Sequence, residues 1–260
     1  MRLGCCASLD ALDAVRDAGF AYVEPRVVDL VPDDDETVYA PIRRRIQDVG
    51  LPAEAFNVFV PAHHPVVGPK RDRPGLRAYV DTAMGRMSEL GTRVVVFGSG
   101  PARTTPSGYD RHRVPDEILE FLSLVADAAA PYDLDIVIEP LWREVCDNIN
   151  TVLEAAVVAR QSGISRVAAL ADWWHMKRER EPLTNLAESR DRLRHVHVPV
   201  PPLPGSPSQS TDAGLPEFLR ALTAVNYSGR VSIEDNGKRF ECFSRQAPQA
   251  LAYLRTHLRR

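Results

Sequence analysis

Short apolar runs alternate along the chain with longer segments in which apolar residues recur at helical spacing. The runs are rich in Val, Ile, Leu and Ala, as expected of buried parallel strands, and several helical segments end in Gly. The apolar runs lie at 1–8, 21–25, 51–61, 92–100, 134–140, 164–172, 193–199 and 229–235. The helical segments lie at 9–19, 35–50, 76–91, 113–132, 149–163, 182–190, 213–226 and 245–258. Such alternation predicts a parallel sheet wrapped by helices.

The number of strand–helix units narrows the fold class. Eight units occupy the 260 residues, and no linker between them is long enough to divide the chain. A (β/α)8 barrel typically needs about 250 residues, which this chain provides. The pattern therefore predicts an α/β protein, a (β/α)8 TIM barrel that forms a single domain over residues 1–260.

Each of the last four apolar runs has an acidic or imidazole side chain at or near its C-terminal end. These are Glu139, Asp172, His197 and Glu234. Because the C-terminal ends of barrel strands converge on one mouth, we expect these four side chains to meet there. Three carboxylates and one imidazole suit a divalent cation, with Mn²⁺ expected first and Co²⁺, Mg²⁺ or Zn²⁺ as alternatives. The sequence thus predicts one metal ion held by these four residues.

Composition and charge limit the partners of the chain. A hydrophobic content of 44% and a charged content of 26% are ordinary for a globular protein. The net charge of −3 gives no reason to expect a nucleic-acid or membrane partner. No apolar stretch approaches membrane-spanning length, and the N-terminus lacks the apolar core of a signal peptide. The four cysteines lack disulfide-framework spacing, which favours free thiols and a cytoplasmic location.

Four sequence motifs bring a known family into view. The segments IEPLWREVCDNINTV, ADWWHMKRERE, HVHVP and VSIED resemble the fifth- to eighth-strand motifs of xylose isomerase-like TIM barrels. That family holds sugar-phosphate isomerases and epimerases, including ketose 3-epimerases and hydroxypyruvate isomerases. The resemblance implies that Glu139, Asp172, His197 and Glu234 bind one divalent metal, the set already selected by position. It also implies that His175, three residues after the aspartate, contacts substrate oxygens.

The chemistry implied by this resemblance needs such a set of residues. Removing a proton next to a carbonyl leaves an enediolate, whose charge a Lewis-acidic metal stabilises. A carboxylate on one face of a sugar-like substrate removes the proton, and a second carboxylate on the opposite face returns it. We assign these acid–base roles to Glu139 and Glu234. Return to the same carbon gives epimerisation, and return to its neighbour gives isomerisation.

All three tryptophans of the chain lie close to a proposed ligand in sequence. An indole face packs well against the C–H face of a sugar. Ordinary packing between barrel and helices is the alternative for Trp142, Trp173 and Trp174 alike. We select Trp142 and Trp174 as substrate contacts, the former because it occupies a position where the family often has a polar residue.

Several other polar residues are weaker candidates for a position at the mouth of the barrel. His195 lies one step deeper than His197 on the same strand, and we expect it to pack behind the ligands. His63 and His64 are expected to be loop residues, and Glu24 either faces the mouth or forms a structural ion pair. The proline-rich segment 199–212 is interpreted as a surface connection, with a lid over the mouth as the alternative.

Two departures from the ketose epimerases concern the substrate. Their glutamate six positions after the strand-five ligand is replaced by Val145, and their arginine six positions after the strand-seven histidine by Leu203. Both family residues contact the far end of the sugar. Their replacement argues against a standard free ketose and favours a modified sugar, a cyclitol or a small hydroxy-ketone. A homodimer is compatible with this interpretation.

Three alternative functions remain in view. A metal-dependent dehydratase of a cyclitol ketone, like the inosose dehydratases, begins with the same proton abstraction. A binding barrel without turnover is favoured by the two departures but disfavoured by the complete ligand set, because buried carboxylates without a metal repel one another. An endonuclease IV-type enzyme requires three zinc ions, and the sequence offers too few further ligands for them.

Overall fold

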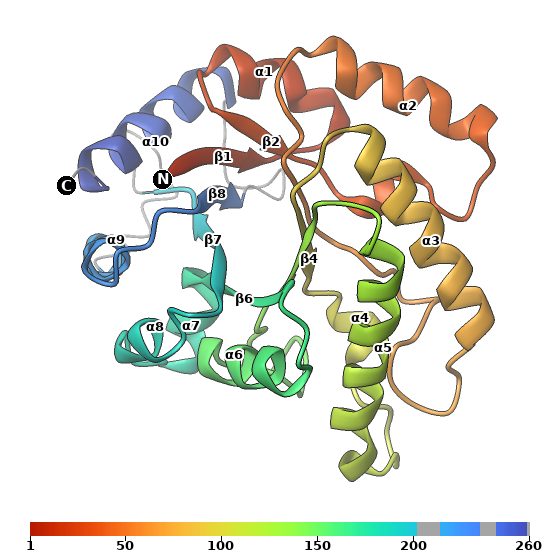
Figure 1. Ribbon diagram of the computed structural model, residues 1–260. Coiled ribbons are helices and arrows are strands. Elements are labelled where there is room, and N and C mark those ends of the chain that lie inside the picture. Colours follow the sequence, from red (N-terminus) through yellow and green to blue (C-terminus); the bar gives the residue numbers. More distant parts are fainter. Residues whose placement is uncertain (202–213, 235–242, 259–260) are drawn as a thin grey trace.

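The predicted barrel is confirmed by a computed structural model that describes residues 1–201, 214–234 and 243–258. Eight parallel strands run in the order β2-β1-β8-β7-β6-β5-β4-β3, with helices arranged around them (Figure 1). The strands are β1 Arg2–Cys6, β2 Tyr22–Glu24, β3 Ala55–Phe56, β4 Val94–Phe97, β5 Asp135–Ile138, β6 Val167–Asp172, β7 Leu193–Pro199 and β8 Arg230–Glu234. The fold is thus a TIM barrel, as the alternating pattern predicts.

The barrel closes between β2 and β3 through the residues that follow these two strands. Arg26 and Asn57 form an isolated parallel bridge. The Val27 amide donates to the Asn57 carbonyl at 2.8 Å, and the Asn57 amide donates to the Pro25 carbonyl at 3.0 Å. Strand β3 is much shorter than the predicted run 51–61, because the left-handed backbone of Val58 (φ 47°) turns the chain away soon after Phe56.

The helices follow the predicted segments, with additions at the C-terminal ends of strands. The principal helices are α1 Leu12–Asp17, α2 Glu36–Asp48, α3 Arg73–Glu89, α5 Val114–Ala129, α6 Val152–Gln161, α8 Thr184–Glu188, α9 Leu215–Ala224 and α10 Phe243–His257. Two short α-helices were not predicted, α4 Gly100–Arg103 after β4 and α7 Trp173–Glu179 after β6. Helix α7 begins directly after Asp172, whose side chain accepts a hydrogen bond from the His175 amide and caps the helix.

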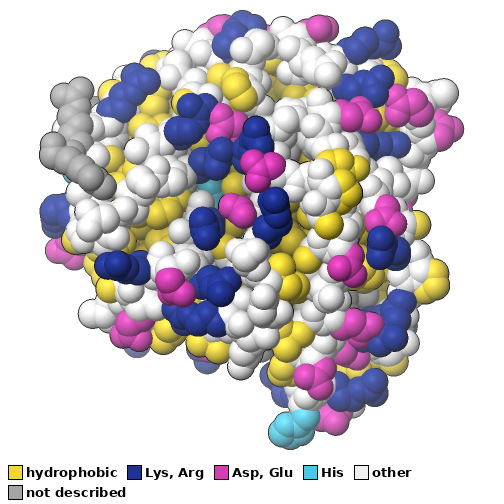
Figure 2. Space-filling view, in the orientation of Figure 1, with side chains coloured by type: hydrophobic (Ala, Val, Ile, Leu, Met, Phe, Trp, Pro, Cys, Tyr) yellow, Lys and Arg dark blue, Asp and Glu magenta, His cyan; other side chains and the backbone are white. Residues whose placement is uncertain are grey.

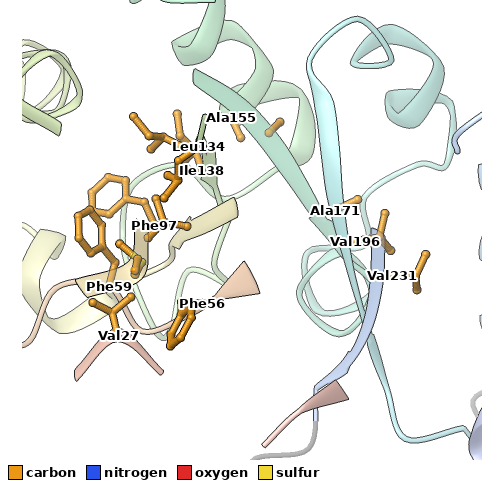
Figure 3. Close-up of a cluster of buried hydrophobic side chains, with 14 of the residues drawn as sticks. Val27, Phe56, Phe59, Phe97, Leu134, Ile138, Ala155, Ala171, Val196 and Val231 are labelled. Carbon is orange, nitrogen blue, oxygen red and sulfur yellow. The ribbon is translucent and has the colours of Figure 1, made fainter. Parts of the chain in front are cut away.

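Two hydrophobic clusters result from the alternation of side chains along each strand. The larger one fills the space between strands and helices, and Figure 3 shows part of it around Phe59, Phe97 and Ile138. The smaller one occupies the barrel interior. Its members are Tyr22, Ala55, Val94, Val96, Val137, Ala168 and Leu170. Residues of the same parity, further along these strands, therefore point into the C-terminal mouth.

The Tyr22 ring fits inside the barrel because Gly4 on the neighbouring strand has no side chain. A Cβ atom at Gly4 would lie 2.3 Å from the Tyr22 ring. The Tyr22 hydroxyl reaches across to Ser232 on β8 at 2.7 Å. This contact connects the apolar interior layer to the polar layer above it.

On one face of the molecule, charged residues of both signs lie together and do not form a single-sign patch. Figure 2 shows Lys or Arg and Asp or Glu side chains intermixed around the middle of one face. One ion-pair group joins Glu54 to Arg2 and to Arg230, whose Nε lies 2.7 Å from a Glu54 carboxylate oxygen.

No disulfide joins Cys5, Cys6 or Cys146, the three cysteines within the described ranges, as predicted. None of the helices described here is long and apolar enough to cross a membrane.

Glu181 is a buried carboxylate outside the mouth. One of its oxygens accepts from the Val152 amide and the Asn185 side chain, each at 2.8 Å. The other oxygen has no hydrogen-bond partner among the described residues. Burial raises the pKa of Glu181 to about 7.

Replacing Glu181 by Gln should remove a pH-dependent loss of stability. The folded pKa of about 7 exceeds the ordinary 4.5, so this group favours the folded state below pH 4.5. That contribution is lost as the pH rises toward 7, by up to ~3 kcal/mol. Urea unfolding at several pH values should show E181Q gaining free energy of unfolding, relative to the wild type, across this range. A pH-independent difference between the two proteins would contradict the prediction.

Candidate metal centre

The four residues selected from the strand ends lie together at the C-terminal mouth. Glu139 follows β5, Asp172 and Glu234 end β6 and β8, and His197 lies near the end of β7. One ligand atom from each falls within 4.8 Å of all the others. Nδ1 of His197 lies 3.2 Å from a Glu139 oxygen and 3.9 Å from an Asp172 oxygen. The fold therefore brings three oxygen donors and one nitrogen donor together in a single small space.

A bulge in β7 turns its two histidines into the barrel. The pairing of β6 with β7 runs from Ala169↔Leu193 to Leu170↔His195, so Arg194 is skipped. Leu193 belongs to the outer core, and an unbroken strand would direct His195 and His197 to that same side. Because of the bulge, both imidazoles are fully buried inside the barrel. The bulge therefore directs the imidazole of His197 into the cluster.

The cluster is electrostatically strained by its own carboxylates. Burial, followed by the charge of Glu139, raises the pKa of Asp172 to about 6. Burial and the charges of Asp172 and Glu139 raise the pKa of Glu234 to about 8. Burial also acts on Glu139, but the hydrogen bond and charge of His197 outweigh it and hold its pKa below the ordinary value. A divalent cation among these oxygens would relieve the repulsion, so the donor set fits one.

Gly98 and Arg103 fix the position of Glu139, and sequence reasoning selected neither. A Cβ atom at Gly98 would lie 2.0 Å from a Glu139 carboxylate oxygen. Arg103 is fully buried and donates to the Phe97 carbonyl at 3.1 Å and to the Glu139 carbonyl at 2.8 Å. The guanidinium thus joins the ends of β4 and β5. The sequence FGSGPAR contains both residues but carries no signal of this contact.

His175 lies beside the cluster as a neutral donor. Its Nδ1 accepts the Trp142 backbone N–H at 2.9 Å, so in the neutral ring the proton is on Nε2. Burial lowers the pKa of His175, which keeps the ring neutral at physiological pH. The charges of Glu139 and Glu234 act in the opposite direction on this pKa, but burial outweighs them. Nε2–H is therefore the hydrogen-bond donor that the ring retains.

Trp142 and Trp174 meet at the rim, whereas Trp173 packs away from it. The Trp142 and Trp174 rings lie 5.9 Å apart in an edge-to-face arrangement. The exposed guanidinium of Arg178 lies 4.9 Å from both ring centroids. Trp173 is buried and stacks on Phe218 at 5.1 Å. The two tryptophans selected as substrate contacts are thus the half-buried pair, with the exposed Arg178 beside them.

Glu24 pairs with two buried histidines, which is the structural ion-pair role that the sequence offered as one of its two alternatives. It is fully buried and contacts His197 at 2.8 Å and His195 at 2.8 Å. Burial acts to raise the pKa of Glu24, but the charges and hydrogen bonds of the two histidines outweigh it and leave the pKa well below normal. The expectation that His195 packs behind the ligands agrees with this position.

Other candidates lie away from the cluster. His63 and His64 are on the loop after β3, where both imidazoles contact Asp33, at 2.9 and 2.8 Å. Val145 is 45% exposed. Leu203 lies outside the described residues, as does most of the segment considered as a lid.

Gly98→Ala should displace the Glu139 carboxylate and weaken divalent-cation binding. Because the added methyl group would overlap a carboxylate oxygen, we expect Mn²⁺ affinity to fall by about 10-fold or more. The free energy of unfolding should fall by only about 1–3 kcal/mol. Isothermal titration calorimetry and urea unfolding measure the two quantities.

Gly85→Ala is the matched control for that substitution. Gly85 lies in helix α3 and a Cβ there would meet nothing within 4 Å. This variant should keep wild-type Mn²⁺ affinity and gain up to about 1 kcal/mol of stability. Equal Mn²⁺ affinity in the two variants would show that Gly98 does not shape the cluster.

Comparison with known proteins identifies relatives over most of the chain. The family model for the xylose isomerase-like TIM barrel matches residues 12–258. The 3-dehydro-D-guloside 4-epimerase of Escherichia coli K12 is 30% identical over 191 residues, covering 68% of this chain and 69% of that enzyme. The 2-oxo-tetronate isomerase of Pectobacterium atrosepticum is 26% identical over 236 residues, covering 88% and 86% of the two proteins.

Solved structures share the fold at lower sequence identity. The apo crystal structure of 3-keto-D-glucoside 4-epimerase from E. coli gives a TM-score of 0.78 at 21% identity, covering 98% of this chain and 99% of that one. The IolI protein with a bound zinc atom gives 0.69 at 19% identity, covering 99% and 96%. These names agree with the predicted isomerase class of enzyme. By the family match and by its fold, the chain belongs to the xylose isomerase-like TIM barrel family.

Proposed function

We propose that this protein is a divalent-metal-dependent epimerase or isomerase of a sugar-like carbonyl compound. The observation that carries the proposal is the convergence of Glu139, Asp172, His197 and Glu234 within 4.8 Å. Their oxygen-rich donor set suits Mn²⁺, Co²⁺, Mg²⁺ or Zn²⁺. The zinc atom bound by the IolI protein supports a metal on this fold.

The proposed chemistry is proton transfer at a carbon next to a carbonyl. A divalent cation held by the four residues supplies Lewis-acid stabilisation of the negative charge that develops on the substrate oxygens. Glu139 and Glu234 come from β5 and β8, and we assign to them removal and return of the proton. Nε2–H of His175 donates to a substrate oxygen and helps to orient it.

The names of the relatives support a substrate that already carries a carbonyl group beside the reacting carbon. In a 3-dehydro-guloside the carbonyl at carbon 3 adjoins carbon 4, the centre that a 4-epimerase inverts. A 2-oxo-tetronate likewise carries its carbonyl within the reacting part of the molecule. An oxidised glycoside or sugar acid agrees better with Val145 and Leu203 than a free ketose does. Trp142 and Trp174 would bind the C–H faces of such a compound.

Solvent-deuterium exchange tests the proposed reaction directly. The protein is incubated in D2O with 3-keto-glycosides, 2-oxo-aldonates, cyclitol ketones and ketoses, with Mn²⁺ and after treatment with EDTA. We expect deuterium to enter next to the carbonyl only when metal is present. Loss of water instead would indicate a dehydratase, and the absence of exchange with metal bound would favour a barrel that only binds.

Glu139→Gln should abolish turnover while the fold persists. The neutral amide of glutamine cannot accept the substrate proton as a carboxylate does, so the rate of deuterium exchange should fall by about 10²–10⁴-fold. Glu144→Gln provides the control, because Glu144 is an exposed glutamate on the same loop. Circular dichroism and Mn²⁺ titration confirm that E139Q is folded and loaded. Near-wild-type exchange in E139Q would remove Glu139 from the mechanism.

A further inference from the structure

We propose that Glu24 is a positioning residue of the metal centre, holding His197 so that Nδ1 is the atom that binds the cation. The proposal rests on the metal-binding part of the function proposed above. Glu24 ends β2 and is not one of the four residues around the cation space. It acts through His197, with which it shares a buried hydrogen bond.

Both carboxylate oxygens of Glu24 are occupied by buried donors. Oε1 lies 2.8 Å from Nε2 of His197. Oε2 lies 2.8 Å from Nε2 of His195 and accepts the Ser232 hydroxyl at 2.5 Å. The side chains of Glu24, His195 and His197 are fully buried, and so is Ser232. Glu24 therefore contacts three buried side chains, and all three hold it in place.

This arrangement selects the proton position on His197. An ionised carboxylate only accepts hydrogen bonds, so Nε2 of His197 must carry its proton toward Glu24. The remaining nitrogen, Nδ1, faces Glu139 and Asp172 at 3.2 and 3.9 Å. A neutral ring held in this way presents the Nδ1 lone pair to the cation. A partner carboxylate also makes the ligand imidazole more basic and fixes its ring plane.

The apolar layer beneath Glu24 restricts the movement of this group of side chains. The Ser232 hydroxyl is hydrogen-bonded to the Tyr22 hydroxyl at 2.7 Å. The Tyr22 ring in turn fits only because Gly4 lacks a side chain. The chain of contacts thus runs from the apolar interior of the barrel through Ser232 and Glu24 to His197. Ring rotation in His197 would break the bond to Glu24 in a fully buried place, which is costly.

Glu24→Gln tests this role with a measurement that does not depend on turnover. The amide offers one acceptor oxygen in place of two, so one histidine Nε2–H meets an N–H group and must turn or change tautomer. We expect the Kd for Mn²⁺, measured by calorimetry, to rise about 10- to 100-fold. Glu181→Gln, which alters a buried carboxylate outside the mouth, should keep the wild-type Kd. Unchanged Mn²⁺ affinity in folded E24Q would overturn the proposal.

The wild-type protein provides a second test that is independent of mutant folding. With Zn²⁺ as a diamagnetic probe, ¹⁵N–¹H NMR correlations of the histidine rings identify which nitrogen of His197 carries the proton. We expect protonated Nε2 and zinc-bound Nδ1. Zinc on Nε2 would overturn the proposal even if the metal site itself is real. A protein that binds neither Mn²⁺ nor Zn²⁺ would instead refute the function proposed above.

Discussion

Repulsion among three carboxylates held around one imidazole is the constraint on which the rest of the mouth depends. Burial and like charge together raise the pKa values of Asp172 and Glu234, which shows that the arrangement is costly by itself. A divalent cation would convert that repulsion into attraction. The neighbouring residues Gly98, Arg103 and Glu24 all restrict where the donor atoms lie. Their contacts are understandable as positioning of a cation site.

The barrel interior is built in two layers with different chemistry. The lower layer is apolar, and Gly4 leaves room there for the Tyr22 ring. The upper layer is polar and consists of residues of the same strand parity one step nearer the mouth. The Tyr22–Ser232 contact joins the two layers, so the packing of the core and the orientation of the ligands are mechanically connected.

The rim of the mouth differs in character from the centre. At the centre the donors are fixed by buried contacts, which suits chemistry common to a family of enzymes. At the rim Trp142, Trp174 and the exposed Arg178 form an aromatic and cationic surface, and Val145 is exposed nearby in sequence. In TIM-barrel enzymes in general, catalytic residues lie at the strand ends, and variation of the loops that follow the strands adapts the fold to different chemistries.

The pattern of apolar and polar residues was enough to predict the eight strand–helix units and the four residues at the strand ends, because periodicity and burial act locally and parallel strands share one direction. It did not reveal the bulge at Arg194, which reverses the simple alternation and turns His195 and His197 inward. Nor did it reveal the partner of Glu24, because that contact joins residues 173 positions apart. Only the closed barrel decided these features, since closure brings distant strands to one axis and leaves buried polar groups no water to bind.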